Sequence, residues 1–233
     1  MILLRRSDER GYFNHGWLQT YHSFSFGEYY DPQQMGFGVL RVINQDAIAE
    51  GRGFPMHGHR DMEIITYVTE GSLSHRDTLG NSATISPGEV QRMSAGTGIR
   101  HSEVNALGDL ATKLYQIWIL PEKEDIPPSY DQKNFSEKLS QSGLHLVASR
   151  LGREGSITLN QDVDLYVGRW TSSHEQDLPL SPDRRGWLQV IKGEVVLSGE
   201  SLKAGDGAGI EKETNVGLQV SGDTEVLFFN MPY

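Results

Sequence analysis

The apolar residues of this chain come in short runs separated by glycine, and this pattern constrains the fold most. Runs rich in Val, Ile, Leu and Tyr span residues 38–44, 63–68, 114–120, 188–191 and 226–229. Each run has the length of a strand, and helical periodicity is weak throughout. Because 26 of the 233 residues are glycine, turns between such strands are easily formed. The sequence therefore predicts an all-β fold of barrels or sandwiches.

The two halves of the chain share a pattern. Residues 67–71 and 190–193 each run from an apolar strand into a glycine, and residues 85–89 and 202–206 each end in Gly-Glu or Gly-Asp. Such a pattern can recur by chance in β proteins. Since the two similarities come in the same order, we predict a duplicated β unit.

A stretch rich in proline and acids, residues 121–130, separates the two halves. Prolines interrupt regular structure, so we interpret it as the exit from a first domain. The expected domains are an N-terminal one at residues 1–125 and a C-terminal one at residues 126–233. Each has the size of a compact β domain.

Composition excludes several classes of protein. The chain has no cysteine, so disulfides and thiolate metal sites are absent, and a bound metal would need His and carboxylate ligands. Its net charge of −10 argues against binding to nucleic acid. Its apolar runs are shorter than a membrane span or the core of a signal peptide. We therefore expect a cytoplasmic protein with no membrane or nucleic-acid partner.

Histidines and acids lie at strand spacing in two segments of the first half. His57, His59 and Glu63 occupy odd-numbered positions of one segment, and His101 and Glu103 lie two residues apart in the other. Residues two apart in a strand face the same side, so two neighbouring strands would bring these groups together. Imidazole nitrogens bind metal ions at about 2.0–2.2 Å. We predict one metal ion at His57, His59 and His101, with Glu63 or Glu103 as the carboxylate.

The second half serves as an internal control. When the two halves are aligned on their glycine turns, the positions of His57 and His59 correspond to Pro179 and Ser181. The positions of His101 and Glu103 correspond to Leu218 and Val220. None of these four side chains is a usual metal ligand. The second half is thus predicted to be a structural copy that lacks metal ligands.

Both segments resemble the motifs of the cupin superfamily. The first motif, G-x5-H-x-H-x3-4-E, matches at Gly51, His57, His59 and Glu63. The end of the second, H-x3-N, matches at His101 and Asn105, after an insertion that follows the Pro-Gly of the motif. With that insertion, residues 22–26, 36–44 and 93–103 are similar to the pirin family of bicupins.

The resemblance to pirins covers nearly the whole chain and implies two jelly-roll cupin domains with β-barrel form. It implies that His57, His59, His101 and Glu103 are the metal ligands. Glu63 would then be a neighbour that orients an imidazole. The expected cofactor is one divalent transition metal, iron in the first place, with manganese, nickel, copper or zinc as alternatives.

The resemblance also implies an activity. Short bacterial pirins are assigned quercetin 2,3-dioxygenase activity, which opens the heterocycle of a flavonol and releases carbon monoxide. The expected partners are then a phenolic substrate and dioxygen, with Glu103 as catalytic base. One alternative is a non-catalytic regulatory protein that binds a transcription regulator or a metabolic enzyme. Another is a different cupin reaction on another phenolic.

The remaining rings are predicted to be structural. The aromatic residues that could line a flat pocket are expected mainly in the core; they are Trp17, Phe24, Phe26, Phe54 and Trp118. The other histidines lack a partner at ligand spacing and are expected to be structural or exposed; they are His15, His22, His75, His145 and His174.

Overall fold

The computed structural model describes residues 1–106, 110–213 and 215–233, which form two compact units. The N-terminal unit comprises Gly11–Ser136 with Leu159–Gln161. The C-terminal unit comprises Met1–Arg10, Glu137–Thr158 and Asp162–Tyr233. Apart from strands, the described elements are the helix α1 (Ser136–Leu139) and the 3-10 turns η1 (Ser7–Glu9) and η2 (Arg153–Gly155). The all-β prediction is confirmed.

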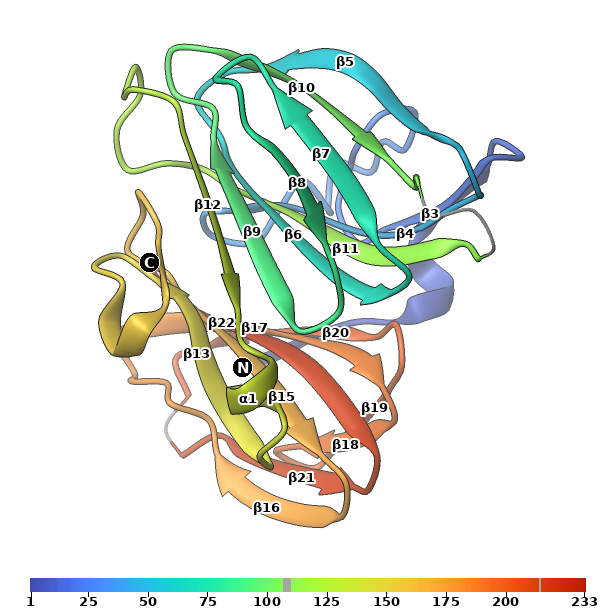
Figure 1. The fold of residues 1–233 in the computed structure, drawn as a ribbon. Coiled ribbons are helices and arrows are strands. Elements are labelled where there is room, and N and C mark those ends of the chain that lie inside the picture. Colours follow the sequence, from blue (N-terminus) through green and yellow to red (C-terminus); the bar gives the residue numbers. More distant parts are fainter. Residues whose placement is uncertain (107–109, 214) are drawn as a thin grey trace. The chain divides into compact units, whose positions relative to one another are not determined.

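The N-terminal unit consists of a seven-stranded and a four-stranded sheet (Figure 1). The larger sheet has the order β12 (Ser129–Asn134), β9 (Glu89–Ser94), β6 (Glu63–Glu70), β11 (Thr112–Ile119), β4 (Leu40–Ile48), β3 (Leu18–His22), β2 (Gly11–Asn14). The smaller one has the order β5 (Gly53–His59), β10 (Ile99–Val104), β7 (Leu73–Asp77), β8 (Ser82–Ile85).

The C-terminal unit repeats this plan. Its larger sheet has the order β1 (Ile2–Arg5), β20 (Gly207–Glu211), β17 (Arg184–Lys192), β22 (Thr224–Pro232), β15 (Asp164–Trp170), β13 (Gly143–Ser149), β14 (Ile157–Thr158). Its smaller sheet has the order β16 (Ser173–Asp177), β21 (Gly217–Ser221), β18 (Glu194–Leu197), β19 (Glu200–Lys203). Each unit is thus a jelly roll of two sheets, and in the described residues their ladders do not join into one closed barrel.

Equivalent glycine turns relate the two units. Gly71 follows β6 and Gly193 follows β17, with φ of 73° and 78°. Both angles lie in the left-handed region that favours glycine. At either position a Cβ would also crowd the backbone of the next paired strand, Thr112 or Thr224. The repeat in the sequence therefore marks one tight turn that occurs in both units.

Each unit buries an apolar core between its sheets. In the N-terminal unit Ile48, Val68 and Leu114 of the larger sheet pack with Leu73 and Ile85 of the smaller one. The C-terminal core includes Trp170, Leu188, Val195, Leu197, Leu218 and Phe228. The apolar sides of the paired sheets thus hold each unit together.

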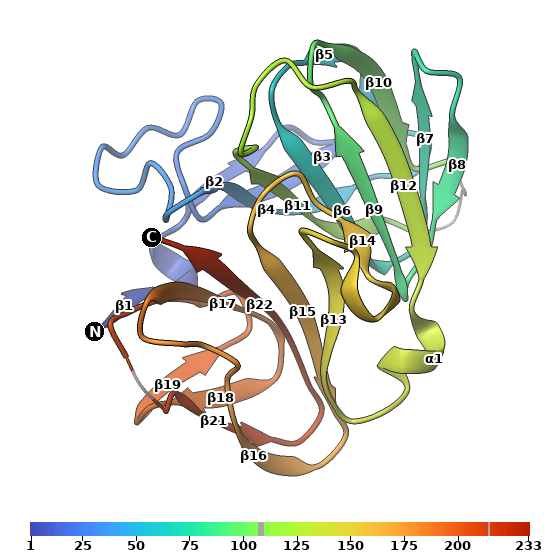
Figure 2. The same cartoon turned by 90° about the vertical axis from the view of Figure 1, so that its left-hand side faces the viewer.

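The boundary between the units differs from the predicted 125/126. The first strand, β1, pairs with β20 and belongs to the C-terminal unit. Figure 2 shows β1 among the strands of this unit. In the other direction β12 pairs with β9, so the N-terminal unit extends to Ser136. These exchanges put β12 and β1 at equivalent edges of the two larger sheets. Pairing of edge strands depends on distant partners, which a local composition shift does not reveal.

The five apolar runs all fall in the larger sheets. They correspond to β4, β6, β11, β17 and β22. In β6 the first six residues are all buried, which explains why these strands read as continuous apolar runs rather than alternating ones. The most recognisable strands are therefore those of the core, and the strands that carry the candidate site are less apolar.

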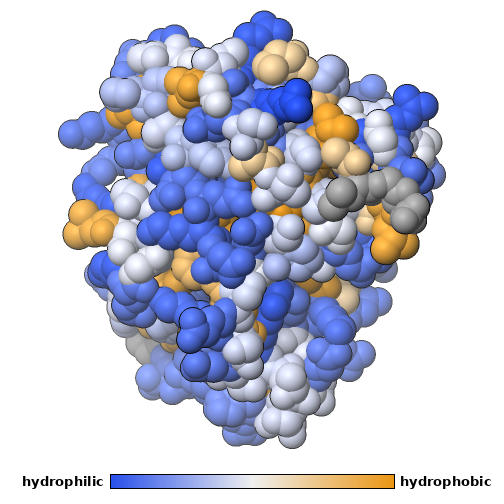
Figure 3. Space-filling model, in the orientation of Figure 1, coloured by the Kyte–Doolittle hydropathy of each residue, from blue (hydrophilic) through white to orange (hydrophobic). Residues whose placement is uncertain are grey.

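The helix α1 and the 3-10 turns η1 and η2 in the described part of the chain are only three or four residues long. No helix there has both the length and the apolar character needed to span a bilayer. On the face drawn in Figure 3, hydrophilic side chains predominate and hydrophobic ones are scattered, as is usual for exposed protein surface.

Candidate metal centre

Two antiparallel strands of the N-terminal unit carry the predicted histidines. On β5, His57 and His59 lie two residues apart and face one side. On β10, His101 pairs directly with His57, and Ile99 pairs with His59. The strand pairing thus brings His101 next to two imidazoles that precede it by 44 and 42 residues in the sequence.

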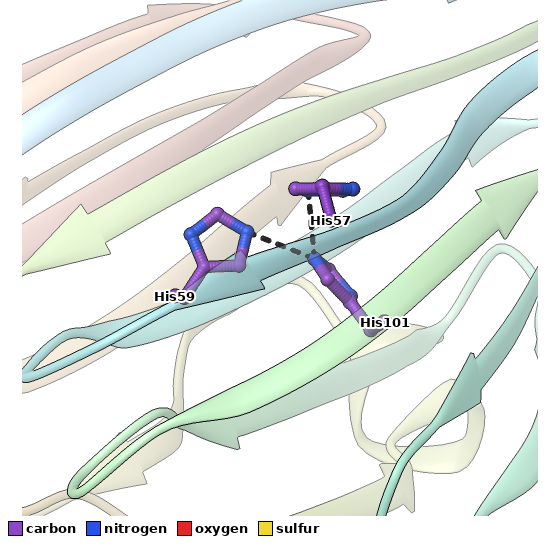
Figure 4. Close-up of side chains that lie close together, drawn as sticks. All are labelled: His57, His59 and His101. Carbon is purple, nitrogen blue, oxygen red and sulfur yellow. Dashed lines mark hydrogen bonds between the residues drawn. The ribbon is translucent and has the colours of Figure 1, made fainter.

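The three imidazoles point at one another (Figure 4). His101 Nε2 lies 3.0 Å from His59 Nε2 and 3.1 Å from His57 Nε2. Two nitrogens bound to one ion at about 2.1 Å lie about 3.0–3.4 Å apart in octahedral or tetrahedral geometry. The spacing of these donors therefore fits a single transition metal ion.

Burial keeps the rings of His59 and His101 neutral. It lowers the pKa of His59 to about 4, and the neighbouring His57 adds to this effect. It lowers the pKa of His101 to about 2, with further contributions from His57, His59 and His75. A neutral imidazole has a free lone pair, which metal binding requires. The electrostatics of the cluster thus agree with its geometry.

Glu103 lies beside His101 but outside the group of donors that His101 forms with His57 and His59. A β-bulge between His101 and Glu103 shifts the register, so that Glu103 pairs with Phe54. Its carboxylate accepts hydrogen bonds from Gln116 Nε2 at 2.8 Å and Thr66 Oγ1 at 3.3 Å. Burial raises the pKa of Glu103 to about 7. Its oxygen lies within 4.8 Å of ring nitrogens of His101 and His75, whereas His57 and His59 form a group with His101 alone.

Glu63 is not part of the cluster. It begins β6 in the larger sheet, and its carboxylate accepts hydrogen bonds from the backbone N and the side-chain Nδ2 of Asn160, both at 3.2 Å. Because these bonds hold Glu63 to the segment Leu159–Gln161 of the same unit, the idea that it orients an imidazole is not supported.

The histidine that lies against the cluster is His75. It is fully buried on β7, and its Nδ1 lies 3.4 Å from Nδ1 of His101. The prediction that His75 is merely structural or exposed is therefore too simple. A sequence signal was present, because His75 and Asp77 lie two apart and β7 neighbours β10. That signal needs the strand order, which the sequence does not provide.

A cavity of about 380 Å³ opens beside the cluster. His57, His59 and Glu103 contribute to its wall, and its other side chains include Phe13, His22, Phe26, Asn44, Asp46, Phe54, Gln116 and Trp118. Of the aromatic residues considered in the sequence, Phe26, Phe54 and Trp118 line this cavity, and Phe24 is buried in the core. The site thus combines flat apolar walls with a few buried polar groups.

The strand register identifies the C-terminal counterparts of the site. His75 and Leu197 each lie four residues after their equivalent glycine turn. His75 pairs with Glu103, and Leu197 pairs with Leu218. Leu218 therefore occupies the position of Glu103.

The same register places Val216 at the position of His101. Val216 O accepts a hydrogen bond from Leu178 N, so Leu178 lies opposite it as His57 lies opposite His101. The alignment on glycines had set Pro179, Ser181, Leu218 and Val220 against the ligands, which is wrong by one or two residues. Among the described residues, both groups of side chains that could hold a metal lie in the N-terminal unit.

Comparisons with known proteins agree with this architecture. The Pirin family profile matches residues 4–119, and the profile of the quercetinase C-terminal cupin domain matches residues 146–231. The chain is 47% identical over 232 residues to quercetin 2,3-dioxygenase of Escherichia coli K12, covering 100% of this chain and 99% of that one. It is 39% identical over 228 residues to a pirin-like protein of Caulobacter vibrioides, covering 97% and 98%.

Solved structures lead to the same family. The crystal structure of the bacterial pirin YhhW from Escherichia coli in complex with nickel(II) superposes with a TM-score of 0.95 and 46% identity, covering 100% of this chain and 99% of that one. Quercetin 2,3-dioxygenase from Acinetobacter baumannii shares the fold with a TM-score of 0.78 and 21% identity, covering 99% of this chain and 86% of that one. Two jelly-roll units, one of them with a histidine cluster, and these full-length similarities show that the chain is a metal-binding bicupin of the pirin family.

Proposed function

We propose that this pirin is a metal-dependent dioxygenase that cleaves quercetin or a related flavonol. The observation that carries the proposal is the convergence of three imidazole Nε2 atoms beside a cavity with aromatic walls. Its full-length similarity to the quercetin 2,3-dioxygenase of Escherichia coli supports the choice of substrate. In the reaction one flavonol and one dioxygen give one depside and one carbon monoxide.

His57, His59 and His101 would hold the metal, with Glu103 as the fourth ligand. Their donor set of imidazole and carboxylate suits iron, manganese, nickel, copper or zinc. Iron is our first expectation, and nickel is the metal in the complex of the Escherichia coli pirin. When bound, such an ion stabilises a deprotonated substrate hydroxyl and takes part in electron transfer between substrate and dioxygen.

Glu103 is the proposed catalytic base. With a pKa of about 7, it is suited to accept a proton near neutral pH. Gln116 Nε2 holds one carboxylate oxygen at 2.8 Å, and Trp118 Nε1 in turn donates to Gln116 Oε1 at 3.2 Å. This chain of hydrogen bonds orients the carboxylate toward the cavity side of β10. The proton of the flavonol 3-hydroxyl would move to Glu103.

The cavity is suited to a flat phenolic. Its volume of about 380 Å³ lies in the usual range of small-molecule sites, about 300–1,000 Å³. Phe26, Phe54 and Trp118 offer faces on which an aromatic ring can pack. These partly buried rings would also exclude water from the reacting atoms.

The proposal is tested with metal-loaded protein, quercetin and dioxygen. We expect the flavonol absorbance to fall and carbon monoxide to appear in equal amount. His57→Ala and His101→Ala should each lose this activity. His174→Ala is the matched control, because His174 is an exposed histidine of the C-terminal unit. Activity that survives both site substitutions would contradict the assignment.

The same protein should be tested for protein partners. Recovery of one stoichiometric partner together with negligible turnover of phenolics would favour the regulatory alternative. Turnover of a different phenolic would retain the site and replace the substrate. A cytoplasmic location stays a prediction of the sequence.

A further inference from the structure

A buried chain of hydrogen bonds extends from His101 away from the other two histidines. His101 Nδ1 faces His75 Nδ1 at 3.4 Å, and His75 Nε2 faces Asp77 Oδ2 at 3.0 Å. The side chains of His75 and Asp77 are completely buried. All three residues lie on the paired strands β10 and β7. The chain is therefore a fixed part of the protein interior and is not exposed to water.

The carboxylate of Asp77 accepts hydrogen bonds at both of its oxygens. Its Oδ1 accepts hydrogen bonds from Leu79 N at 2.9 Å and Asn81 N at 3.0 Å, and its Oδ2 accepts one from Asn81 Nδ2 at 2.9 Å. Burial by itself would raise the pKa of Asp77, but the hydrogen bonds from Asn81, His75 and Leu79 hold it below its usual value. Asp77 is thus ionised, and the hydrogen on its bond to His75 must come from His75 Nε2.

This assignment determines the protons along the whole chain. The ring of His75 is fully buried between Asp77 and His101, and in its neutral form it carries one proton. With that proton on Nε2, His75 Nδ1 is an acceptor. The proton between His75 and His101 then belongs to His101 Nδ1. A neutral His101 with its proton on Nδ1 has a free lone pair on Nε2, the atom that faces His57 and His59.

The surroundings of His75 keep its ring in this position. The ring of Tyr130 packs against it with 4.9 Å between centroids and 33° between planes. Asn81, which lies in the turn between β7 and β8, holds both oxygens of Asp77. The direction of the hydrogen bonds is therefore set by a rigid turn and a packed ring.

We propose that Asp77 and His75 are positioning residues that fix the proton of His101 on Nδ1 and so preset its Nε2 as a metal ligand. The inference rests on the proposed metal site and adds two residues that are not themselves ligands in it. A carboxylate behind a ligating histidine commonly strengthens metal binding by about 10- to 100-fold. Here a second histidine transmits the effect of the carboxylate.

Asp77→Asn is the most informative test, because it changes the direction of the chain and little else. The amide oxygen, in the place of Oδ1, can still accept from Leu79 N, Asn81 N and Asn81 Nδ2. The amide nitrogen, in the place of Oδ2, can donate to His75 Nε2 and gives up only the second hydrogen bond from Asn81 Nδ2. The proton of His75 then moves to Nδ1, and His101 must carry its own proton on Nε2, where it blocks the metal. We expect zinc and nickel to bind about 10- to 100-fold more weakly in competition with a chelator.

The tautomer can be observed without metal. In the metal-free protein, nitrogen NMR of the imidazoles should show His101 protonated on Nδ1, and in Asp77→Asn the signal should shift toward protonation on Nε2. His75→Phe should weaken metal binding to a similar extent. His75→Asn retains an acceptor oxygen near the place of Nδ1 and should restore part of the affinity. Asp31→Asn is the matched control, because Asp31 likewise accepts a backbone hydrogen bond in a turn, from Gln33 N.

The outcomes separate this inference from the proposed function. If the folded Asp77→Asn protein keeps both the affinity and the tautomer of the original, the positioning role is wrong while the metal site stands. If His75→Phe abolishes binding and Asp77→Asn leaves it unchanged, His75 is itself a ligand, and the inference is again wrong. If the original protein binds no metal but shows the predicted tautomer, the proposed function fails, and the proton assignment holds.

Discussion

The two jelly rolls of this protein place very different side chains at the same positions. In the N-terminal unit the inner face of the smaller sheet carries His57, His101 and Glu103. In the C-terminal unit the equivalent positions are Leu178, Val216 and Leu218, which are 4%, 1% and 1% exposed and belong to its core. One unit thus leaves donor atoms and a cavity where the other has closely packed aliphatic side chains.

The larger sheets differ in the same way. Leu114 pairs with Asp46 in the N-terminal unit, and Val226 at the equivalent position pairs with Gly168. A Cβ at Gly168 would lie 2.4 Å from the ring of Trp170. The indole therefore fills the space that Asp46 and the cavity occupy in the first unit. A duplicated fold can keep its backbone while one copy is filled for stability and the other is left open for chemistry.

The largest expected effect comes from making the metal site resemble its C-terminal counterpart. His101→Leu removes the Nε2 atom that faces Nε2 of His57 and of His59. We expect the affinity for nickel or zinc to fall by roughly a thousandfold, or about 4 kcal/mol. Metal content per chain after dialysis measures the change, with His174→Leu as the control. Full occupancy in His101→Leu would mean that the metal lies elsewhere.

A second prediction concerns Asp46 of the N-terminal unit, whose counterpart in the C-terminal unit is Gly168. Burial raises the pKa of Asp46 to about 7, above its ordinary value of 3.8. Between these two values the folded protein holds a proton that the unfolded chain has released, so the free energy of unfolding falls as pH rises from 4 to 7. The contribution of protonated Asp46 to the free energy of unfolding is fully present below pH 4 and lost above pH 7. It amounts to on the order of 4 kcal/mol.

Asp46→Asn removes this dependence. Metal-free protein with the substitution should be more stable than the original at pH 8 and should differ little from it at pH 4. Urea unfolding across this range measures both slopes. Equal slopes in the two proteins would show that Asp46 titrates normally in the folded state.

A third prediction concerns the close packing of the C-terminal unit at Gly168. Gly168→Ala places a methyl group against Trp170, and overpacking of this kind costs about 1–3 kcal/mol. We expect a lower midpoint of urea unfolding with unchanged metal content. Gly16→Ala tests crowding separately from backbone strain, because a Cβ at Gly16, where φ is 81°, meets no atom within 4 Å. A loss at Gly168 no larger than that at Gly16 would contradict the packing argument.

The smallest effect is expected at the support of Glu103. Trp118→Phe keeps an aromatic wall and removes the hydrogen bond from Nε1 to Gln116 Oε1. Loss of one such bond is worth about 1 kcal/mol, which corresponds to roughly a fivefold fall in kcat. Metal content should not change. A fall in metal content instead would mean that Trp118 supports the histidines rather than the carboxylate.

Much of the fold could be predicted from the sequence. The apolar runs that became β4, β6, β11, β17 and β22 are buried on both faces, so their hydrophobicity identifies them without neighbours. The repeat was visible because Gly71 and Gly193 make the same left-handed turn. The edge strands β1 and β12 were not assigned correctly, because their partners are distant in sequence.

The candidate site was predicted in part. Spacing by two identified His57 and His59 as one face of a strand, and the structure sets His101 against them. The same rule put Glu63 on that face, yet Glu63 starts a strand of the other sheet and is held by Asn160. The rule also missed the link from His101 to His75, since it does not say which strands are neighbours.

The sequence by itself determined the residue types and their side within each strand. It limited the ligands to imidazole and carboxylate, it predicted two similar β units, and it confined the candidate ligands to the first. Only the tertiary structure decided which strands meet, because pairing depends on contacts between residues far apart in the chain. It set β5 and β7 on either side of β10, it introduced the bulge between His101 and Glu103, and it placed His75 and Asp77 behind His101, where both side chains are fully buried.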